Sequence, residues 1–518
     1  MDSKTKKKIL GIELGSTRIK SVIIGEDFTP MASGDFVWQS KFENGIWTYN
    51  LEDAWRGIKT SLSKLGGLSA DVDIAGISAM MHGYLAFDKD WNLLVPFRTW
   101  QNTITGEAAE ELTTLFNFNI PQRWSIAHTY QAILNGEEHI KKLAHVTTLS
   151  GYITYKLTGV NAVGLGEASG MFPIDQATGQ FNTGMIEKFD NLIADKGYPW
   201  KLADILPAVA SAGAEAGTLT EEGARMLDEK GVLKAGIPFC PPEGDAGTGM
   251  TATNAVKQRT GNVSAGTSVF SMVVLEKDLS KPYEEIDIVT TPTGDPVAMV
   301  HCNNCTSDIN AWVNLFDEFA NLCGNPIDKN TLYTKLFTVA LDGDADCGGL
   351  VSYNYFSGEP VTGFDEGAPL FVRKADDKFT LANFMRMHIY SSLAALKYGL
   401  DLMFKEEGVK CDEMFGHGGL FKTPKVGQSI AAAAMNAPVS VMDTAGEGGP
   451  WGMALLAAFG DARKKDNSLT LPVFLNDRIF AGNKGSKIEP DADAVKGFDK
   501  FMERYVRGLA AEKAALDI

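Results

Sequence analysis

Cysteine is scarce in this chain, with six residues among 518. A chain of this length with so few cysteines does not depend on a disulfide framework for its stability. Cys302 and Cys305 form a lone C-x-x-C pair, and a tetrahedral metal site would need further soft ligands that the sequence does not offer nearby. We therefore expect packing cysteines and a reducing, cytoplasmic compartment.

Positive charge and long apolar runs are also in short supply. The chain has 48 Lys and Arg against 65 Asp and Glu, a formal charge of −17, which argues against nucleic acid or an anionic membrane surface as a partner. Membrane spans need roughly 18 or more apolar residues in a row, and no stretch approaches that. The apolar run from Ile9 to Leu14 is too short for a signal peptide. These absences predict a soluble protein with a small-molecule partner.

Length and an internal repeat indicate two similar halves. A chain of 518 residues exceeds the usual size of one core, so at least two domains are expected. Residues 9–17 resemble residues 261–268: each reads as a strand that enters a Gly-Ser/Thr turn and returns as an apolar strand. Glycine allows positive φ in such a turn, whose amides can then point together at an anion. One such turn is usually an ordinary hairpin, but two at matching places favour a phosphate ligand.

The remaining pattern predicts α/β packing. Strand-like runs at residues 74–78 and 146–149 alternate with helical ones such as 107–116. Towards the C-terminus, residues 384–404 predict a long helix, residues 414–420 a strand that enters a Gly-rich turn, and residues 425–435 another helix. We interpret this last arrangement as the floor of a nucleotide site.

Taken in order, these motifs resemble those of the FGGY carbohydrate kinases, a branch of the superfamily that includes hexokinases, actin and chaperone ATPases. The resemblance spans nearly the whole chain. The motifs that carry it are residues 11–18, Met81-His82-Gly83, Trp100-Gln101-Asn102-Thr103, Gly244-Asp245-Ala246-Gly247, Gly266-Thr267-Ser268, Ser357-Gly358-Glu359 and Gly418-Gly419.

The resemblance implies an α/β fold of two actin-like (ribonuclease-H-like) domains, each with one phosphate loop, and an interdomain cleft for ATP and sugar. The expected divisions are an N-terminal kinase domain over residues 1–256, a C-terminal kinase domain over 257–470 and a helical tail over 471–518. The tail carries no readable motif, and we expect it to cover a domain or to mediate a homodimer.

The implied activity is ATP-dependent phosphorylation of a small ketose. Met81-His82-Gly83 is similar to the xylulokinases, so D-xylulose is placed ahead of L-ribulose, with gluconate or another polyol as an alternative. A non-catalytic actin-like scaffold or sugar sensor is the alternative of another class. The chain departs from the family pattern at Glu13 and Asn102, where Asp is common, and at residues 167–170, Glu-Ala-Ser-Gly, where Asp-Ala-Ala-Gly is common.

The resemblance also assigns roles at the phosphate-transfer site. Asp245 is the predicted general base, although an Asp here also suits the N-cap of a helix that starts at Ala246. Glu13, with Asp245, is expected to hold Mg²⁺, against the simpler interpretation of a solvated acid beside a turn. The residues expected to bind ATP are Gly15, Ser16, Thr17, Arg18, Gly266, Thr267, Ser268, Gly418, Gly419 and Leu420.

For the sugar, a polyol needs fixed donors and acceptors beside an apolar wall. The expected sugar-binding residues are Met81, His82, Trp100, Asn102, Glu167 and Asp245. His82 is the most specific of these predictions, because a histidine that follows two methionines and precedes Gly83 lies where a strand becomes a turn. The alternative is a structural histidine whose hydrogen bonds are made within the core. The loop before Glu167 equally fits a plain turn.

Overall fold

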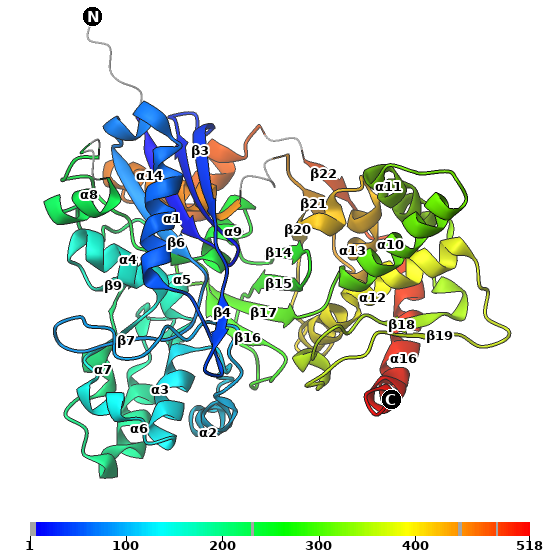
Figure 1. Cartoon of the computed structure of the whole chain (residues 1–518), viewed down its shortest axis with the longest axis horizontal. Coiled ribbons are helices and arrows are strands. Elements are labelled where there is room, and N and C mark those ends of the chain that lie inside the picture. Colours follow the sequence, from blue (N-terminus) through cyan, green and yellow to red (C-terminus); the bar gives the residue numbers. More distant parts are fainter. Residues whose placement is uncertain (1–6, 229–230, 232, 444–447, 483–484) are drawn as a thin grey trace, which may run out of the picture. The chain divides into compact units, whose positions relative to one another are not determined.

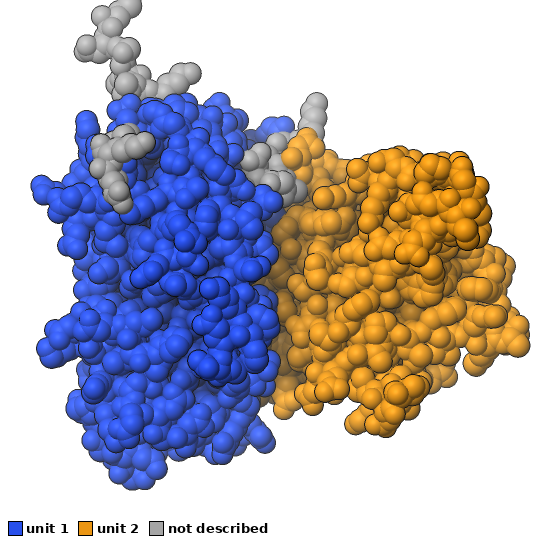
Figure 2. Space-filling view, in the orientation of Figure 1, with its two compact units in different colours: residues 1–256, 288–297, 447–482 blue, residues 257–287, 298–446, 483–518 orange. Residues whose placement is uncertain are grey.

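The computed structural model describes residues 7–228, 231, 233–443, 448–482 and 485–518. The chain divides into two compact units, coloured separately in Figure 2. The first comprises Met1–Val256, Ile288–Val297 and Glu447–Gly482, and the second comprises Lys257–Asp287, Ala298–Gly446 and Asn483–Ile518. The chain returns to the first unit twice, so neither compact unit is one contiguous stretch. In the described part of the chain, no helix is long and apolar enough to cross a membrane.

The first unit is built on a mixed five-stranded sheet, seen with its helices in Figure 1. β1 runs antiparallel to β2 and parallel to β6, and β6 is buried along its whole length. The strands in sheet order are β13 (Glu243–Gly244), β6 (Ile74–Ala79), β1 (Ile9–Leu14), β2 (Arg18–Ile24) and β3 (Pro30–Val37). A strand buried on both faces needs helices on both sides of the sheet.

Helices α1 (Leu51–Ser63) and α14 (Gly448–Lys465) supply those two layers. Ser21 of β2 bonds Ser61 of α1, Oγ to Oγ, at 2.7 Å. Val22, the next residue in β2, points to the face of the sheet opposite to Ser21. Gly11 of β1 pairs with Val22 and lies on that second face, where a Cβ on Gly11 would run into the Pro450 carbonyl of α14. Glycine at this position therefore permits the close approach of α14 to the sheet.

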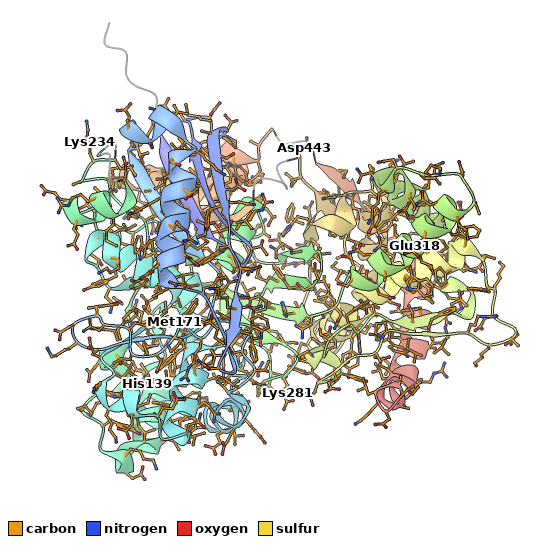
Figure 3. The ribbon with its side chains drawn as sticks, viewed as in Figure 1. His139, Met171, Lys234, Lys281, Glu318 and Asp443 are labelled. Carbon is orange, nitrogen blue, oxygen red and sulfur yellow. The ribbon has the colours of Figure 1, made fainter. Side chains whose placement is uncertain are left out.

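Further short elements complete the first unit. Met171, labelled in Figure 3, is fully buried, and its carbonyl accepts the Ile126 N–H of α3. The other helices are α2 (Gly106–Phe116), α3 (Ser125–Leu134), α4 (Leu149–Thr158), α5 (Leu165–Ala168), α6 (Thr183–Leu192), α7 (Leu202–Ile205), α8 (Glu221–Leu227), α9 (Asp245–Ala252) and α15 (Leu471–Phe474). The strand pairs outside the main sheet are β4 (Lys41–Glu43) with β5 (Ile46–Thr48), β7 (Leu85–Phe87) with β8 (His145–Thr147), β9 (Ala162–Gly164) with β12 (Ala208–Ala210), and β10 (Ile174–Asp175) with β11 (Gln180–Phe181).

The second unit repeats the β1–β2–β6 pattern. β14 runs antiparallel to β15 and parallel to β20, so the repeat expected from the sequence is present in the strand topology. The strands of this unit are, in sheet order, β17 (Pro296–Cys302, of which Ala298–Cys302 belong to this unit), β15 (Val269–Val274), β14 (Thr260–Ala265), β20 (Glu413–His417), β21 (Val439–Val441) and β22 (Ser486–Ile488). β16 (Asp287–Thr290) lies, except for Asp287, in residues of the first unit.

Helices of the second unit agree with the sequence in position, with differences at their ends. The helix expected over 384–404 is α12, Leu381–Asp401, which continues as a π-helical turn over Leu402–Glu406. The terminal helix α16 packs within this unit, where Tyr390 and Phe498 stack at 4.0 Å. The other elements are α10 (Ser307–Leu322), α11 (Lys329–Val339), α13 (Val426–Met435), α16 (Ala492–Ala515), and the pair β18 (Val351–Tyr353) and β19 (Leu370–Val372).

One expected strand is wrong in part. Residues 146–149 were expected to be extended, but β8 ends at Thr147 and α4 begins at Leu149. The reason is local: the Thr148 hydroxyl accepts the Gly151 N–H and so caps the start of α4.

Candidate active site

The first predicted phosphate loop, residues 15–17, joins β1 to β2 and is held from one side by aromatic residues. The Gly15 carbonyl accepts the Trp38 indole N–H at 2.6 Å, and the Ser16 carbonyl accepts the Tyr49 hydroxyl at 2.7 Å. The Thr17 carbonyl accepts the Trp38 backbone N–H at 3.2 Å. Trp38 and Tyr49 are buried and pack ring against ring at 4.3 Å.

This arrangement orients the loop peptides. In a trans peptide the carbonyl and the following N–H point in opposite directions. With the Gly15 and Ser16 carbonyls turned towards the aromatic rings, the N–H groups of Ser16 and Thr17 point to the other side. Neighbouring backbone amides that are not used within the protein can bind an anion.

Arg18, expected at the same phosphates, forms a surface ion pair instead. Its guanidinium lies 3.0 Å from Asp35, which also pairs with Lys64 at 2.9 Å. All three side chains are at least one-third exposed, so these ion pairs are weak. Another anion can therefore replace Asp35 as the partner of Arg18.

Glu13 lies near the end of β1, opposite Ser78 of β6 and Lys20 of β2. A Cβ on Gly449 would overlap its carboxylate, so the start of α14 lies directly against this side chain. Burial and the charge of Asp245 raise the pKa of Glu13 to about 7, against the opposing effect of Lys20. Glu13 and Asp245 are thus close enough to influence each other's ionisation.

Asp245 is the first residue of α9, with Gly244 as the N-cap residue, so the helix begins one residue earlier than the alternative interpretation expected. Its Oδ1 accepts the Met81 N–H at 3.1 Å. Burial raises the pKa of Asp245 to about 6, against the lowering effect of the Met81 and Ala246 amides. At pH 7 the group is still mostly ionised, roughly ten to one.

Two further acids lie behind Asp245 and are fully buried. Glu167 is 0% exposed and Glu243 is 1% exposed, and burial raises the pKa of each to about 8. Glu243 accepts the N–H groups of Gly166 and Glu167 at 3.2 and 3.0 Å. Sequence reasoning did not select Glu243; its one signal was an acid placed between two prolines and the Gly-Asp pair of the motif.

Met81 and His82 lie beside this group of acids. His82 has a left-handed backbone, φ 72°, and its Nδ1 bonds the Gly170 carbonyl at 3.1 Å. A Cβ on Gly170 would lie 2.6 Å from both the His82 Nδ1 and the Met81 Cε. The structure therefore brings Met81, His82, Glu167 and Asp245 together.

Asn102 has a different set of partners. Its Oδ1 accepts the Trp47 N–H at 2.8 Å, and its Nδ2 donates to the Trp47 and Thr99 carbonyls at 2.8 and 2.9 Å. Both amide protons are used, so Asn102 fixes the β4–β5 hairpin to the turn that contains Trp100.

The second predicted phosphate loop, residues 266–268, is held by backbone groups. The Gly266 carbonyl accepts the N–H and the hydroxyl of Thr306 at 3.1 and 2.7 Å, and the Thr267 carbonyl accepts the Cys305 N–H at 2.9 Å. Ser268 completes the turn by accepting the Gly266 N–H at 2.9 Å.

The buried pair of Asn304 and Glu359 stabilises the segment that contains Cys305 and Thr306. Asn304 donates its backbone and side-chain N–H groups to Glu359 Oε2 at 3.2 and 3.1 Å, and its Oδ1 accepts the Phe356 and Ser357 N–H groups. Burial raises the pKa of Glu359 to about 7. The Ser357-Gly358-Glu359 motif thus holds the segment that supports the second loop.

The predicted adenosine residues lie beside that loop. Gly418 has φ 102°, and a Cβ there would overlap the Ala265 carbonyl at the end of β14. Gly418 and Gly419 are exposed, whereas Leu420 is fully buried and offers no side-chain surface.

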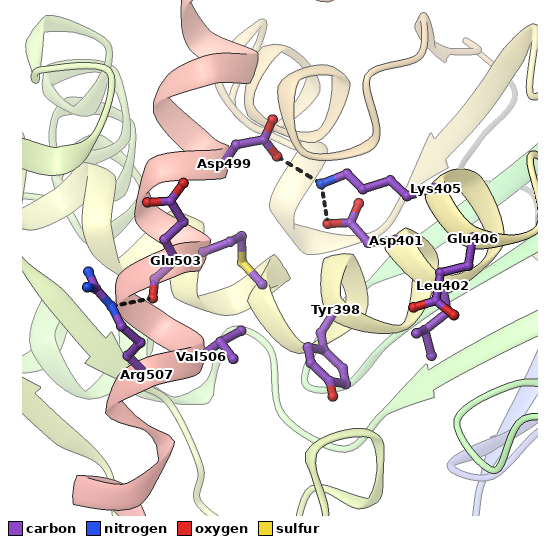
Figure 4. Close-up of a pocket in the computed structure, with 10 residues that line it drawn as sticks. Tyr398, Asp401, Leu402, Lys405, Glu406, Asp499, Glu503, Val506 and Arg507 are labelled. Atoms are coloured by element: carbon purple, nitrogen blue, oxygen red, sulfur yellow. Dashed lines mark hydrogen bonds and ion pairs between the residues drawn. The ribbon is translucent and has the colours of Figure 1, made fainter.

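A groove in the second unit holds none of the predicted residues. It has a volume of about 790 Å³, and Tyr398, Lys405 and Asp499 are among its lining residues (Figure 4). Lys405 pairs with Asp401 and Asp499 at 2.9 and 3.3 Å across it. Because the groove contains none of the predicted residues, it is not our candidate site.

The donor set fits a magnesium ion that arrives with a nucleotide. In the described residues no group of three or more His, Cys, Asp or Glu is arranged to hold a metal. Glu13 and Asp245 are partly accessible carboxylates with mutual repulsion, and Mg²⁺ is commonly held by one or two carboxylates together with substrate phosphates.

Comparison with known proteins concerns the chain as a whole. The N-terminal domain model of the FGGY family of carbohydrate kinases matches residues 8–250, and its C-terminal domain model matches residues 261–460. A xylulose kinase from Haemophilus influenzae is 22% identical over 448 residues, 84% of each chain. A ligand-bound xylulose kinase from Lactobacillus acidophilus has a similar structure, with a TM-score of 0.79, 15% identity and coverage of 98% of this chain and 99% of that one. A gluconate kinase from the same species has a TM-score of 0.78 at 15% identity, with 98% of each chain covered. These likenesses confirm the predicted fold class.

Proposed function

The chain belongs to the FGGY family of carbohydrate kinases, and from this we propose that it transfers the γ-phosphate of ATP to a hydroxyl of a small ketopentose, with Asp245 as the general base. D-xylulose is our first choice and L-ribulose the second.

The observation that carries this proposal is the setting of Asp245. Asp245 is a partly exposed residue whose carboxylate accepts the Met81 N–H at 3.1 Å and has a pKa raised to about 6. A general base works best when its pKa lies near the working pH while the group remains mostly ionised. A non-catalytic scaffold would have no need for such a group.

In the proposed reaction the acceptor hydroxyl gives its proton to Asp245 as its oxygen bonds to the γ-phosphorus. The bond between that phosphorus and the β,γ-bridging oxygen breaks, and ADP leaves with the electron pair. Phosphoryl transfer of this kind depends mainly on positioning and charge neutralisation.

The proposed phosphate-binding amides are those of Ser16 and Thr17 in the first unit and those of Thr267 and Ser268 in the second. Glu13 and Asp245 would hold Mg²⁺, which neutralises phosphate charge when bound. Gly418 and Gly419 are the proposed resting place for adenosine, where absent side chains leave backbone surface.

On the sugar side, Met81, His82 and Trp100 would form the wall and the fixed polar contact. Asn102 would act through the turn that it braces. Glu167 would act from behind Gly244, because it has no exposed surface.

Two observations favour a ketopentose. The first is the Met81-His82-Gly83 segment, and the second is the H. influenzae xylulose kinase relative. Gluconate stays as the second candidate because a gluconate kinase shares the fold.

The test is ADP release by the purified protein with Mg²⁺-ATP and D-xylulose, L-ribulose, D-ribulose, gluconate, glycerol or no sugar. We expect stimulation by D-xylulose above every other member. Stimulation by gluconate alone would move the substrate to the second candidate. Binding of ATP without stimulation by any sugar would contradict the kinase proposal and favour a scaffold or sensor.

A further inference from the structure

Glu243 is a fully buried acid to which the proposed reaction gives no role. A buried carboxyl group is costly unless its oxygens are hydrogen-bonded. The groups that donate hydrogen bonds to the Glu243 oxygens therefore show which part of the fold this side chain stabilises.

Both oxygens of Glu243 are used on one short helix. Oε1 accepts the Gly166 N–H at 3.2 Å and Oε2 accepts the Glu167 N–H at 3.0 Å. These amides belong to the first turn of α5, a helix of 4 residues, which is too short to be stable by itself. A Cβ on Gly166 would lie 2.6 Å from Oε2, and one on Gly247 3.1 Å from it, so glycines surround the carboxyl group closely.

The helix that Glu243 holds borders the proposed sugar site on two sides. Glu167 Oε1 accepts the Ser150 hydroxyl at 3.0 Å, and its Oε2 faces Gly244, where a Cβ would overlap it. Directly after α5, the Gly170 N–H bonds the Glu167 carbonyl at 3.1 Å, while the Gly170 carbonyl bonds His82 at 3.1 Å. Movement of α5 would therefore disturb His82 and the residue before Asp245 together.

We propose that Glu243 is a positioning residue for the sugar side of the site: it anchors the first turn of α5 and through it fixes Glu167, Gly170 and His82 around Asp245. The structural part of this inference is independent of the reaction. Its kinetic part rests on the proposed function.

The variant Glu243→Gln tests the anchoring of α5 separately from its effect on sugar kinetics. An amide nitrogen cannot accept a hydrogen bond, so one of the two α5 amides loses its acceptor while the side-chain volume is kept. Glu512→Gln is the matched control: Glu512 is also 0% exposed and accepts one backbone N–H, that of Ala368 at 3.0 Å, but lies on α16 of the second unit.

The first measurement is amide hydrogen exchange by mass spectrometry without substrates. We expect faster exchange in peptides covering residues 164–170 of E243Q, and no change there in E512Q. Unchanged exchange in E243Q would overturn the anchoring role. If E243Q does not fold, Gly166→Ala perturbs the same contact by placing a methyl group against Oε2.

The second measurement is steady-state kinetics with the sugar that stimulates the wild type. We expect E243Q to raise KM for the sugar about tenfold or more, because small misplacements of binding groups are costly. KM for ATP should stay within about twofold, since the phosphate loops are untouched. Equal changes in both KM values would overturn positioning of the sugar side.

A double-mutant cycle tests the route through Glu167. If Glu243 acts through Glu167, the loss in E243Q/E167Q should be smaller than the product of the two single losses. Independent, multiplicative losses would overturn that route. A wild type that no sugar stimulates would defeat the proposed function alone, because hydrogen exchange still decides the anchoring of α5.

Discussion

The two predicted phosphate loops share a strand topology and differ in their chemistry. Each joins two antiparallel strands beside a parallel third, β6 in one case and β20 in the other. Gly15 and Gly266 each donate to a carbonyl across the turn at 2.9 Å. The carbonyls of Thr17 and Thr267 each accept a backbone N–H, at 3.2 and 2.9 Å. The strand topology of the hairpin is therefore common to both units, whereas the hydrogen bonds fall at different positions of the two turns.

The difference lies two residues before the glycine of each loop. Glu13 occupies that place in the first unit and Ser264 in the second. Glu13 also faces a second acid, Asp245, whose charge raises its pKa. The comparison teaches that the two predicted phosphate loops share their strand topology, and that in the described residues the proposed metal-binding and proton-accepting carboxylates lie beside the first loop.

The largest effect should come from removing the base. Asp245→Asn keeps the shape and loses the proton acceptor, so kcat should fall about 10²- to 10⁴-fold, the usual contribution of general-base catalysis. Ser264→Ala, in the loop without acids, is the matched control and should keep kcat within about twofold. Steady-state ADP release measures both.

ATP binding to Asp245→Asn, followed by calorimetry, separates a lost base from a lost fold. Measured without Mg²⁺, so that the proposed metal role of Asp245 does not contribute, the dissociation constant should stay within about threefold of the wild type. Retained turnover in this variant would contradict the assignment of Asp245.

The next effect concerns Glu13. Glu13→Gln keeps the size of the side chain and removes its charge, so the apparent KM for Mg²⁺-ATP should rise about tenfold, the loss expected for one charge-assisted contact. The defect should shrink when Mg²⁺ is raised. The same titration on Ser264→Ala should match the wild type, and a larger defect there would reverse the comparison of the two loops.

How much of this site the sequence could predict depends on the range of the contacts. The two Gly-Ser/Thr turns, the helix at 426–435 and the helix that begins at Asp245 follow local patterns of glycine, small residues and helical spacing. These patterns act within a few residues, so sequence reasoning finds them.

Long-range supports were not predicted. Trp38 and Tyr49 reach the first loop from more than 20 positions away in the chain, and Glu243 reaches Gly166 across 77 positions. Asn102 was expected at the sugar, but its bonds go to Trp47. No local pattern records which distant backbone group a side chain will meet.

The pH profile gives a smaller and graded effect. The pKa of Asp245 is raised to about 6 and that of Glu13 to about 7. Both must be ionised to act, so kcat/KM should be full above about pH 8 and fall as protons bind Glu13 and then Asp245. In Glu13→Gln the decline should follow a single group near pH 6. A wild-type profile that stays flat to pH 5 would contradict both assignments.

The smallest effect separates the supports of the two loops. Trp38→Phe keeps the ring that packs on Tyr49 and removes the indole N–H bonded to the Gly15 carbonyl. The net loss of one hydrogen bond, about 0.5–1.5 kcal/mol, corresponds to a rise in KM for ATP of roughly two- to tenfold. Thr306→Val removes the matching side-chain bond in the second unit, but the Thr306 N–H still bonds Gly266 at 3.1 Å, so KM should change less. Thermal unfolding of both variants checks that neither unit is lost. A larger rise in KM for Thr306→Val would mean that the second loop, despite its backbone support, depends more on its side chain for holding phosphate.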